Sequence, residues 1–364
     1  MIVRNIEKQI FLVFVLFLAN LSHLSLHGQQ LTLLFAGDIM GHDTQIESAK
    51  KQGAGEYNYS SCFQYLEPLI SSADIAIGNL EVTLAGPPYK GYPAFSSPDE
   101  LALELKRVGF DILVHANNHA IDRRKKGLER TLTTLDSAGI IHSGVFKNLQ
   151  ERSIHYPLIV EKNGIRLAFL NYTYGTNGIK VTAPNIVNYI DTAQIKIDLA
   201  KARTAKPDFI IVLMHWGNEY ERKENSKQRS IAEFLLKNGT DAIIGSHPHV
   251  VQPIRMEQRK NLVAYSMGNM ISNQRKRYTD GGIMVEMTLE KSDSTYITDY
   301  SYLPIWVYKP QLKNGTAFQL IPAAIDSSMQ SEIKMESTDV KKMLLFLEDT
   351  RNNLEGNIES DWKR

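Results

Sequence analysis

The sequence predicts an α/β protein in which buried strands are covered by helices on both faces. Runs such as "DFIIVLMHW" and "DAIIGS" are apolar without interruption, which is typical of strands buried on both sides. Segments with helical spacing of apolar residues separate these runs, and such alternation is typical of α/β folds. With 364 residues, 43% of them hydrophobic and 22% charged, the chain is long enough for one large core.

The first half of the chain begins this alternation. The predicted order is strand 30–40, helix 59–73, strand 74–81, helix 97–109, strand 110–116, helix 125–139 and strand 140–145. Ser97 and Glu100 have the spacing of a capping box, and Pro98 would occupy the first helical position. Gly139 is expected to end the predicted helix 125–139.

The second half continues in the same way. The predicted order is hairpin 156–175, helix 191–205, strand 207–216, helix 227–239, strand 240–246 and strands 261–271 and 281–291. Asn163 and Gly164 form the expected type I′ turn of the hairpin. An aromatic, alternating stretch at 294–310 and a helix at 337–354 follow. We therefore expect a core domain at 29–290 and a small β/α appendage at 291–364 that packs on it.

The first 28 residues have the order of a secretory signal peptide. Basic residues precede an apolar stretch from Ile10 to Ala19, and the small residue Gly28 follows. This stretch is shorter than the ~20 residues of a membrane span, although an uncleaved N-terminal anchor is the alternative. The sequence thus predicts an exported protein that is periplasmic or associated with the cell surface.

The net charge bears on the class of binding partner, and the cysteine count bears on disulfide bonds. The net charge is +1, from 41 Lys and Arg against 40 Asp and Glu, so no global field favours nucleic acid, and we expect no nucleic-acid partner. The one cysteine, Cys62, forbids an internal disulfide, and a core of this size does not need one.

Polar side chains follow six of the predicted strands. They are Asp38; Asn79 and Glu81; Asn118 and His119; His215 and Glu219; His247 and His249; and Asn269. In α/β sheets, sites form outside the carboxyl ends of strands, where the loops converge. Imidazole and carboxylate together suit divalent transition metals, so we expect one or two ions of Mn, Zn or Fe.

Each of these elements has a purely structural alternative. Asp38 after a glycine is typical of a turn or a helix cap, and the Asn118–His119 pair is typical of a hydrogen-bonded loop. The pair His247 and His249 is more specific, because Pro248 makes the spacer rigid and the two imidazoles can serve two different metals. The common position of all six groups at strand ends favours a metal site.

The order of the motifs resembles the CapA family of poly-γ-glutamate capsule biosynthesis proteins, which are similar to calcineurin-like metallophosphoesterases. The resemblance covers residues 31–286 and is carried by "GDIM", "GNLE", "ANNHAID", "MHWGNEY", "GSHPHVVQPI" and "YSMGN". It implies a four-layer α/β sandwich and two metals that position and activate a water.

The resemblance also implies roles for particular residues. Asp38 and His249 would hold one metal, and the other would be held by Asn118, His215 and His247. His119 would be the catalytic acid that protonates the leaving group. The chain departs from the metallophosphoesterase pattern at two positions: Met40 replaces a histidine, and Asn79 replaces the bridging aspartate, with the carboxylate of Glu81 two residues further on.

These observations support a metal-dependent hydrolase of capsule or cell-envelope polymer synthesis, acting on a phosphoester or on a γ-linked amide. Expected partners are an extracellular polymer or phosphoester substrate and a capsule-synthesis complex at the membrane. Substrate contacts or support for the metal ligands are expected from Asn79, Glu219, Tyr265 and Asn269. Two alternatives stay open, namely a non-catalytic protein that binds or assembles the polymer and an exported nucleotide phosphoesterase.

Overall fold

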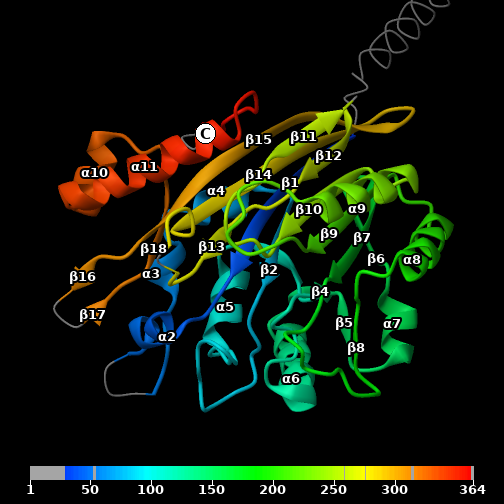
Figure 1. Ribbon diagram of the computed structural model, residues 1–364, viewed down its shortest axis with the longest axis horizontal. Coiled ribbons are helices and arrows are strands. Elements are labelled where there is room, and N and C mark those ends of the chain that lie inside the picture. Colours follow the sequence, from blue (N-terminus) through cyan, green and yellow to red (C-terminus); the bar gives the residue numbers. More distant parts are fainter. Residues whose placement is uncertain (1–28, 52–54, 258, 275, 313–314, 362–364) are drawn as a thin grey trace, which may run out of the picture.

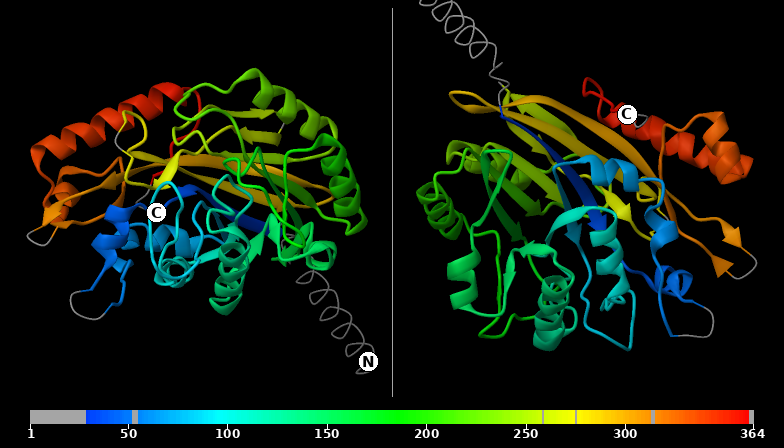
Figure 2. Two further views of the ribbon diagram at one scale, coloured as in Figure 1. Left: turned by 60° about the horizontal axis from the view of Figure 1, so that its bottom comes forward. Right: turned by 180° about the vertical axis from the view of Figure 1, so that it is seen from behind.

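The computed structural model describes residues 29–361 with the exception of 52–54, 258, 275 and 313–314. The predicted signal segment, 1–28, lies outside the described residues. Among the described residues, no helix has both the length and the apolar character needed to cross a membrane. Two sheets lie face to face and helices cover their outer faces, so the molecule is a four-layer α/β sandwich (Figures 1 and 2).

The first sheet is mixed. In pairing order its strands are β18 (Gln319–Pro322), β15 (Thr295–Tyr308), β14 (Gly281–Lys291), β1 (Gln29–Ile39), β2 (Ile75–Leu80), β3 (Phe110–Val114) and β4 (Ile141–Ser143), and β13 (Asn269–Ile271) also pairs with β1. The strands from β1 to β4 are parallel, as is β13 to β1, whereas β14 runs antiparallel to β1. The carboxyl ends of β1, β2 and β3 therefore lie at the same edge.

The second sheet has a parallel centre and antiparallel edges. In pairing order its strands are β11 (Ile254–Glu257), β12 (Lys260–Ala264), β10 (Ala242–Ser246), β9 (Phe209–His215), β7 (Ile165–Thr173) and β6 (Leu158–Lys162). The central strands β12, β10, β9 and β7 are parallel, and β11 and β6 are antiparallel to their neighbours. Their near-continuous apolar runs agree with burial on both faces.

Helices cover the outer faces of both sheets. On the first sheet lie α2 (Asp43–Ala49), α3 (Ser60–Phe63), α4 (Glu67–Ser72), α5 (Glu100–Arg107) and α6 (Arg124–Ser137); on the second lie α8 (Thr192–Thr204) and α9 (Ser226–Lys237). The short helix α7 (Leu149–His155) buries no side chain and lies beside a small ribbon of β5 (Val145–Phe146) and β8 (Ile186–Val187).

Strand β1 shows how the layers form. Leu31, Leu33 and Phe35 point into the core between the two sheets, and Leu34 and Ala36 point into the core beneath the helices. Successive strand side chains point to opposite faces, so an apolar run serves both layers. The α/β class predicted from such runs is confirmed, as is the sandwich that the family resemblance implied, but each sheet has helices on one face and the other sheet on its second face.

The C-terminal residues continue the first sheet. Strand β15 pairs with β14 along the length of both strands, and β18 pairs with β15. Helices α10 (Ser327–Ile333) and α11 (Ser337–Asn353) pack on this extension around Trp306 and Phe346, and a ribbon of β16 (Gln311–Leu312) and β17 (Gly315–Thr316) lies at its end (Figure 1). The region predicted as an appendage shares a sheet with the core.

Local predictions had different outcomes. Asn163 and Gly164 both have positive φ and join β6 to β7, so the hairpin is confirmed. The predicted capping box is wrong: the helix begins at Glu100, and the Ser97 hydroxyl makes no hydrogen bond with the part of the chain that the structure describes. The helix expected at 59–73 is divided into α3 and α4, because Pro68 in the first turn of α4 cannot donate the hydrogen bond that would continue α3.

A close backbone approach fixes the end of β1. A Cβ on Gly37 would overlap the carbonyl oxygen of Gly268, and this oxygen accepts a hydrogen bond from the next amide, that of Asp38 (3.0 Å). Asp38 and Asn269 are consequently partners in the register of β1 and β13. The absence of a side chain at position 37 thus brings two predicted site residues together.

We expect Gly37→Ala to destabilise the protein by about 1–3 kcal/mol, because the added methyl group forces β1 away from residues 267–268. Urea unfolding of the metal-free protein would measure the change. Gly175→Ala is the matched control, since a Cβ at Gly175 meets no atom within 4 Å. Equal losses for the two variants would contradict the close-approach argument.

Candidate metal centre

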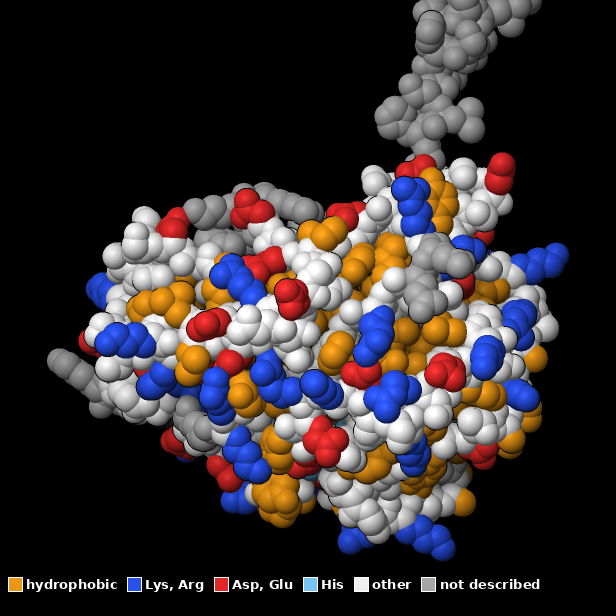
Figure 3. All heavy atoms as spheres, turned by 45° about the horizontal axis from the view of Figure 1, so that its top comes forward, with side chains coloured by type: hydrophobic (Ala, Val, Ile, Leu, Met, Phe, Trp, Pro, Cys, Tyr) orange, Lys and Arg blue, Asp and Glu red, His pale blue; other side chains and the backbone are white. Residues whose placement is uncertain are grey.

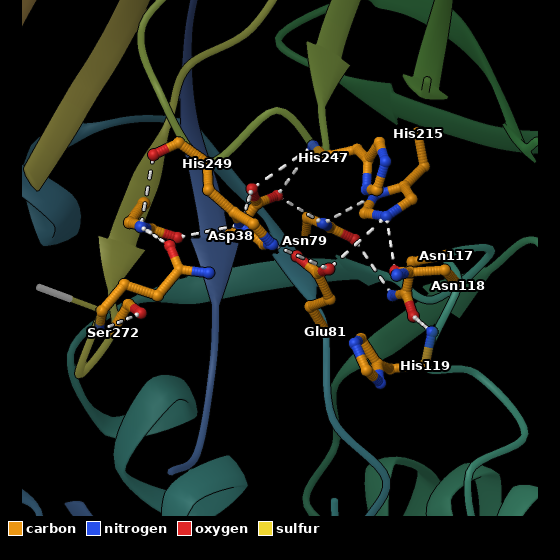
Figure 4. Close-up of polar contacts among 12 residues, drawn as sticks. Asp38, Asn79, Glu81, Asn117, Asn118, His119, His215, His247, His249 and Ser272 are labelled. Carbon is orange, nitrogen blue, oxygen red and sulfur yellow. Dashed lines mark hydrogen bonds and ion pairs between the residues drawn. The ribbon is translucent and has the colours of Figure 1, made fainter. Parts of the chain in front are cut away.

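The strand ends bring most of the predicted site residues into one buried cluster. Asp38 is the penultimate residue of β1, Glu81 follows β2, His215 ends β9, and His247 and His249 follow β10. Figure 4 shows Asp38, Asn79 and Glu81 in the middle of the cluster, with His249 on one side and His215 and His247 on the other. Asp38 and Glu81 are fully buried, and each of the three histidines is at most 3% exposed.

One group of potential metal ligands consists of Asp38, Glu81 and His249, which offer ligand atoms within 4.8 Å of one another. His249 Nδ1 lies 3.1 Å from an oxygen of Asp38 and 3.1 Å from Oδ1 of Asn269. Asn79 donates to the other oxygen of Asp38 (2.8 Å). The pairing of Asp38 with His249 that the family resemblance implied is therefore present in the geometry.

A second group consists of Glu81, His215 and His247, again within 4.8 Å. His215 Nε2 lies 2.8 Å from Oδ1 of Asn118, and the rings of His215 and His247 have centroids 4.8 Å apart. The three residues expected to share a metal, Asn118, His215 and His247, thus lie together. Glu81 belongs to both groups, a position suited to a carboxylate that bridges two metals.

Glu81 is a buried carboxyl group with a raised pKa and no hydrogen-bond partner among the described residues. Burial and then the negative charge of Asp38 raise its pKa well above the ordinary value. Neither of its carboxylate oxygens has a hydrogen-bond partner among the described residues, and the same is true of Nδ1 of His247. Buried polar atoms without partners are costly and call for a missing ligand. The donor set of carboxylate, imidazole and amide oxygen fits divalent metals.

The pKa of Asp38 is shifted in the opposite direction, below the ordinary value. Burial raises its pKa, but the hydrogen bond and charge of His249, together with Asn79 and His247, outweigh burial and lower the pKa below the ordinary value. The backbone amide of His247 also donates to both oxygens of Asp38 (3.3 Å each). Asp38 is therefore held as a charged ligand, next to a carboxylate that takes up a proton more readily.

His215 and His247 are held neutral by their surroundings. Burial, followed by the charges of His247 and His249, lowers the pKa of His215 well below the ordinary value. Burial, followed by the charge of His249, lowers the pKa of His247 to about 3. Neutral imidazole is the form that binds metal, so the environment prepares these side chains as ligands.

The backbone of the Ser-His-Pro-His segment is strained. His247 has φ of 100° and His249 has φ of 58°, in a region that side chains other than glycine rarely adopt. Such residues cluster at functional sites, where surrounding structure holds them in place. Here the amide of His247 is fixed on Asp38, and the carbonyl oxygen of His249 accepts from Asn269 (3.3 Å).

His119 lies beside the ligand groups and is oriented by Asp122. The distance from His119 Nδ1 to Asp122 Oδ2 is 2.7 Å, and both side chains are buried. The Phe95 ring packs edge-on against the imidazole, with centroids 4.7 Å apart. Asp122 accepts at Nδ1 and so fixes the orientation of the imidazole through one ring nitrogen, without involving the other.

The structure does not place every predicted site residue in the cluster. Glu219 is exposed, although close enough for its charge to raise the pKa of Glu81. Tyr265 packs in the core behind the second sheet, where it stacks on Trp216. Met40 is 2% exposed and packs in the core beneath the helices, so its thioether replaces the expected histidine as a packing group.

Three neighbours of the cluster escaped sequence analysis. Asp122 stands three residues after His119, a spacing that could have indicated the pair. Tyr174 follows β7 and lies against His247, with ring centroids 4.5 Å apart, so its position at a strand end was a usable signal. The side-chain nitrogen of Asn177, from the same loop, lies 3.4 Å from Nδ1 of His119, and nothing in the local sequence indicates that contact.

The fold and the cluster define an α/β sandwich protein with a polar centre, suited to divalent metals, at its strand ends. The model of the family "Bacterial capsule synthesis protein PGA_cap" matches residues 32–274, a span that contains every residue of the cluster. The chain belongs to this family, and the predicted family resemblance is confirmed.

Two curated proteins show the same relationship. The chain is 27% identical over 295 residues to the capsule biosynthesis protein CapA of Bacillus anthracis, covering 78% of this chain and 69% of that protein. It is 29% identical over 301 residues to the PGA biosynthesis protein CapA of Bacillus subtilis (strain 168), covering 79% and 76%.

Among solved structures, the NAD nucleotidase NadN of Haemophilus influenzae is similar, with a TM-score of 0.50 and 15% identity. The match covers 91% of this chain, which spans 64% of the length of that one. At this identity the likeness shows the fold alone.

The depressed pKa of His247 predicts how the metal-free protein responds to acid. Between pH 3 and 6.5 the unfolded chain protonates this imidazole while the folded protein does not, so stability falls as the pH falls. His247→Asn keeps a residue that tolerates positive φ and removes this contribution. We expect its unfolding free energy to depend less steeply on pH than that of the wild type, by about 1.4 kcal/mol per pH unit.

Urea unfolding at several pH values between 4 and 6.5 would measure the two slopes. His155→Asn, a substitution at an exposed histidine outside the cluster, serves as the control and should leave the slope of the wild type unchanged. Identical slopes for wild type and His247→Asn would show that His247 is not held neutral.

Proposed function

We propose that this protein is a metal-dependent hydrolase of capsule or other extracellular polymer biosynthesis. The observation that carries the proposal is Glu81, a fully buried carboxylate that has no hydrogen-bond partner among the described residues and belongs to two groups of potential metal ligands. A centre for two adjacent metals is a recurring device for hydrolysis. The names of the two curated relatives, both CapA proteins, support the polymer context.

The residues divide between the two ligand groups. Asp38 and His249 would hold one ion and His215 and His247, with Asn118, the other, while Glu81 would contact both. When bound, such ions supply Lewis acidity, which polarises the scissile bond and makes water acidic enough to deprotonate near neutral pH. Asn79 orients the cluster, since its amide donates to Asp38 and its oxygen accepts from Asn117 (3.2 Å).

His119 would act as the acid for the leaving group. Its Nδ1 is held by Asp122, so a proton on the other ring nitrogen can be given to the departing oxygen or nitrogen. The walls of the cluster exclude bulk water, which strengthens the charge interactions inside it. A phosphoester and a γ-linked amide both fit this arrangement, because each needs a polarised bond, a deprotonated water and a protonated leaving group.

We also propose export to the periplasm or the cell surface and contact with a capsule-synthesis complex at the membrane. Basic residues followed by the apolar stretch Ile10–Ala19 support export. The strands of the first sheet place the cluster at the carboxyl end of β1, whereas the residues before Gln29 join its opposite end. Any anchor in that segment would leave the centre directed away from the point of attachment.

A second candidate is a protein that binds the polymer without cleaving it. Asn79 favours it, because a neutral amide occupies the place of a bridging carboxylate and donates to Asp38. In that case the centre would bind metal and polymer, and no substrate would be turned over. The two candidates therefore differ in turnover.

Metal content tests the centre itself. We expect about two equivalents of Mn, Zn or Fe after reconstitution, measured by elemental mass spectrometry, because two ligand groups are present. The double variant His247→Ala with His249→Ala should lose the metal. Glu81→Gln should lower the content to one equivalent or less, since both groups contain Glu81. Glu219→Gln, at an exposed carboxylate nearby, is the control. Wild-type protein that holds no metal would refute the proposed function.

Asp122→Asn tests the role of His119. We expect kcat/KM for a generic phosphodiester to fall about 10²-fold while the metal content stays at the wild-type value, because the ligands are untouched. The pH profile of kcat/KM should also shift, which loss of packing alone would not cause. A variant with wild-type kinetics would exclude Asp122 as the group that orients His119. Absence of turnover in wild-type protein loaded with metal would favour the polymer-binding candidate.

A further inference from the structure

A large groove lies next to the metal centre. It has a volume of about 1070 Å³ and is bordered by Gln274 with residues 276–280 of the same loop, by the end of β15 with residues 309–312 and by helices α10 and α11. We call it the C-terminal groove. All of its lining residues except Gln274 lie beyond residue 274, where the match to the family model ends. The groove is thus built by the part of the chain outside that match.

The loop at 274–280 connects the groove to the centre. The side-chain oxygen of Gln274 accepts from Asn269 (2.9 Å), and Oδ1 of Asn269 lies 3.1 Å from His249 Nδ1. Lys276 places its ammonium group 3.7 Å from the ring centroid of Tyr220, and that ring lies 6.3 Å from the ring of His249. A substrate held at the centre therefore has this loop as its neighbour on the His249 side.

Cationic and acidic side chains both line the groove, but two lysines, Lys276 and Lys309, lie where it meets the centre. The acidic lining residues are Asp280, Glu336, Asp339 and Asp349, of which Asp339 pairs with Lys342 (2.9 Å). Lys276 is exposed and makes no salt bridge with any described residue. Lys309 donates to the carbonyl oxygen of Gln274 (3.1 Å), so its charge is held at the same loop. Arg277 pairs with Asp349 (2.9 Å) on α11. Figure 3 shows Lys and Arg side chains in a band below the C-terminal part of the chain.

The walls of the groove are held firmly. The rings of Trp306 and Tyr308 are buried and stacked, with centroids 5.9 Å apart, and the indole nitrogen of Trp306 donates to Asp280 (2.9 Å). Tyr278 lies between the guanidinium groups of Arg222 and Arg277, 4.3 Å and 4.8 Å from its ring centroid. Rigid walls keep the cations at fixed positions, which lowers the cost of ordering them around a ligand.

We propose that the C-terminal groove is a subsite of the metal centre that binds an anionic group, carboxylate or phosphate, carried by the substrate at a distance from the bond held at the centre. This rests on the proposed function. Lys276 and Lys309 are the recognition groups, because both line the groove at the loop it shares with the centre. The volume exceeds the ~300–1,000 Å³ of a usual small-molecule pocket, so a segment of an acidic chain fits.

Binding of acidic oligomers to the metal-loaded full chain tests the proposal. Fluorescent oligo-γ-glutamate provides the carboxylate probe and a short polyphosphate provides the phosphate probe, with Kd measured by anisotropy at about 0.1 M salt. A series at position 276, with Lys276→Arg, Lys276→Met and Lys276→Glu, changes the charge stepwise. We expect Kd for at least one probe to rise in that order, by about tenfold or more for Lys276→Glu.

A matched control separates the groove from the general surface charge. Lys341→Glu, on the exposed side of α11 and outside the lining residues, should leave Kd within about twofold of the wild type, since exposed charges beyond contact distance are screened. Adding Lys309→Gln to Lys276→Glu should weaken binding further. Which probe responds identifies the anionic group.

The outcomes distinguish this proposal from the proposed function. Equal binding by wild type and Lys276→Glu, or no binding of either probe to the wild type, would overturn the subsite, even if the protein hydrolyses a phosphodiester. Charge-dependent binding by a wild-type protein that turns over no substrate would uphold the subsite and refute the hydrolase. A Lys276→Arg variant as weak as Lys276→Glu would also overturn the proposal, because a loss independent of charge indicates disturbed packing.

Discussion

Glu81 carries a carboxyl group that is excluded from water and hydrogen-bonded to nothing among the described residues. Removing an ionised carboxylate from water costs several kcal/mol unless a counter-charge or a proton compensates. With Asp38 ionised and His215 and His247 neutral, the two carboxylates carry a formal charge of −2 when Glu81 is ionised as well. Divalent cations would balance that charge and offer partners to the unpaired carboxylate oxygens, which is the physical argument for the proposed metal centre.

Packing between the two sheets provides the favourable free energy that offsets the cost of burying these polar groups. Apolar side chains from both sheets fill the layer beneath the cluster, and Phe35, Ile211 and Ile244 are at most 1% exposed there. Burial of this surface contributes about 25 cal/mol per Å² to the stability of the fold. The candidate ligands lie at or just after the ends of the strands that provide it. The position of the ligands at strand ends lets a stable core hold strained groups such as His247. The residues that stabilise the core and the candidate ligands therefore follow one another along the same segments of the chain.

Sequence patterns predicted the core and the grouping of the candidate ligands because both depend on local order. A strand that ends in a polar residue is visible in the sequence, as at Asp38 and at His215. The start of α5 was predicted wrongly because Ser97 is buried, and its surroundings rather than its spacing decide its contacts. The C-terminal groove could not be predicted, since Gln274, Tyr308 and Phe346 meet only through the addition of β15 and α11 to the first sheet.

The substitution of Asn79 for a bridging aspartate is compatible with a centre for two metals because of how β2 ends. The amide of Glu81 donates to the carbonyl oxygen of Ile39 (3.0 Å), so the pairing with β1 continues one residue past the last strand residue, Leu80. Residues two apart in a strand point to the same face, and Glu81 therefore projects beside Asn79. The chain therefore offers a carboxylate at position 81 rather than at position 79, and the side-chain amide of Asn79 donates to Asp38.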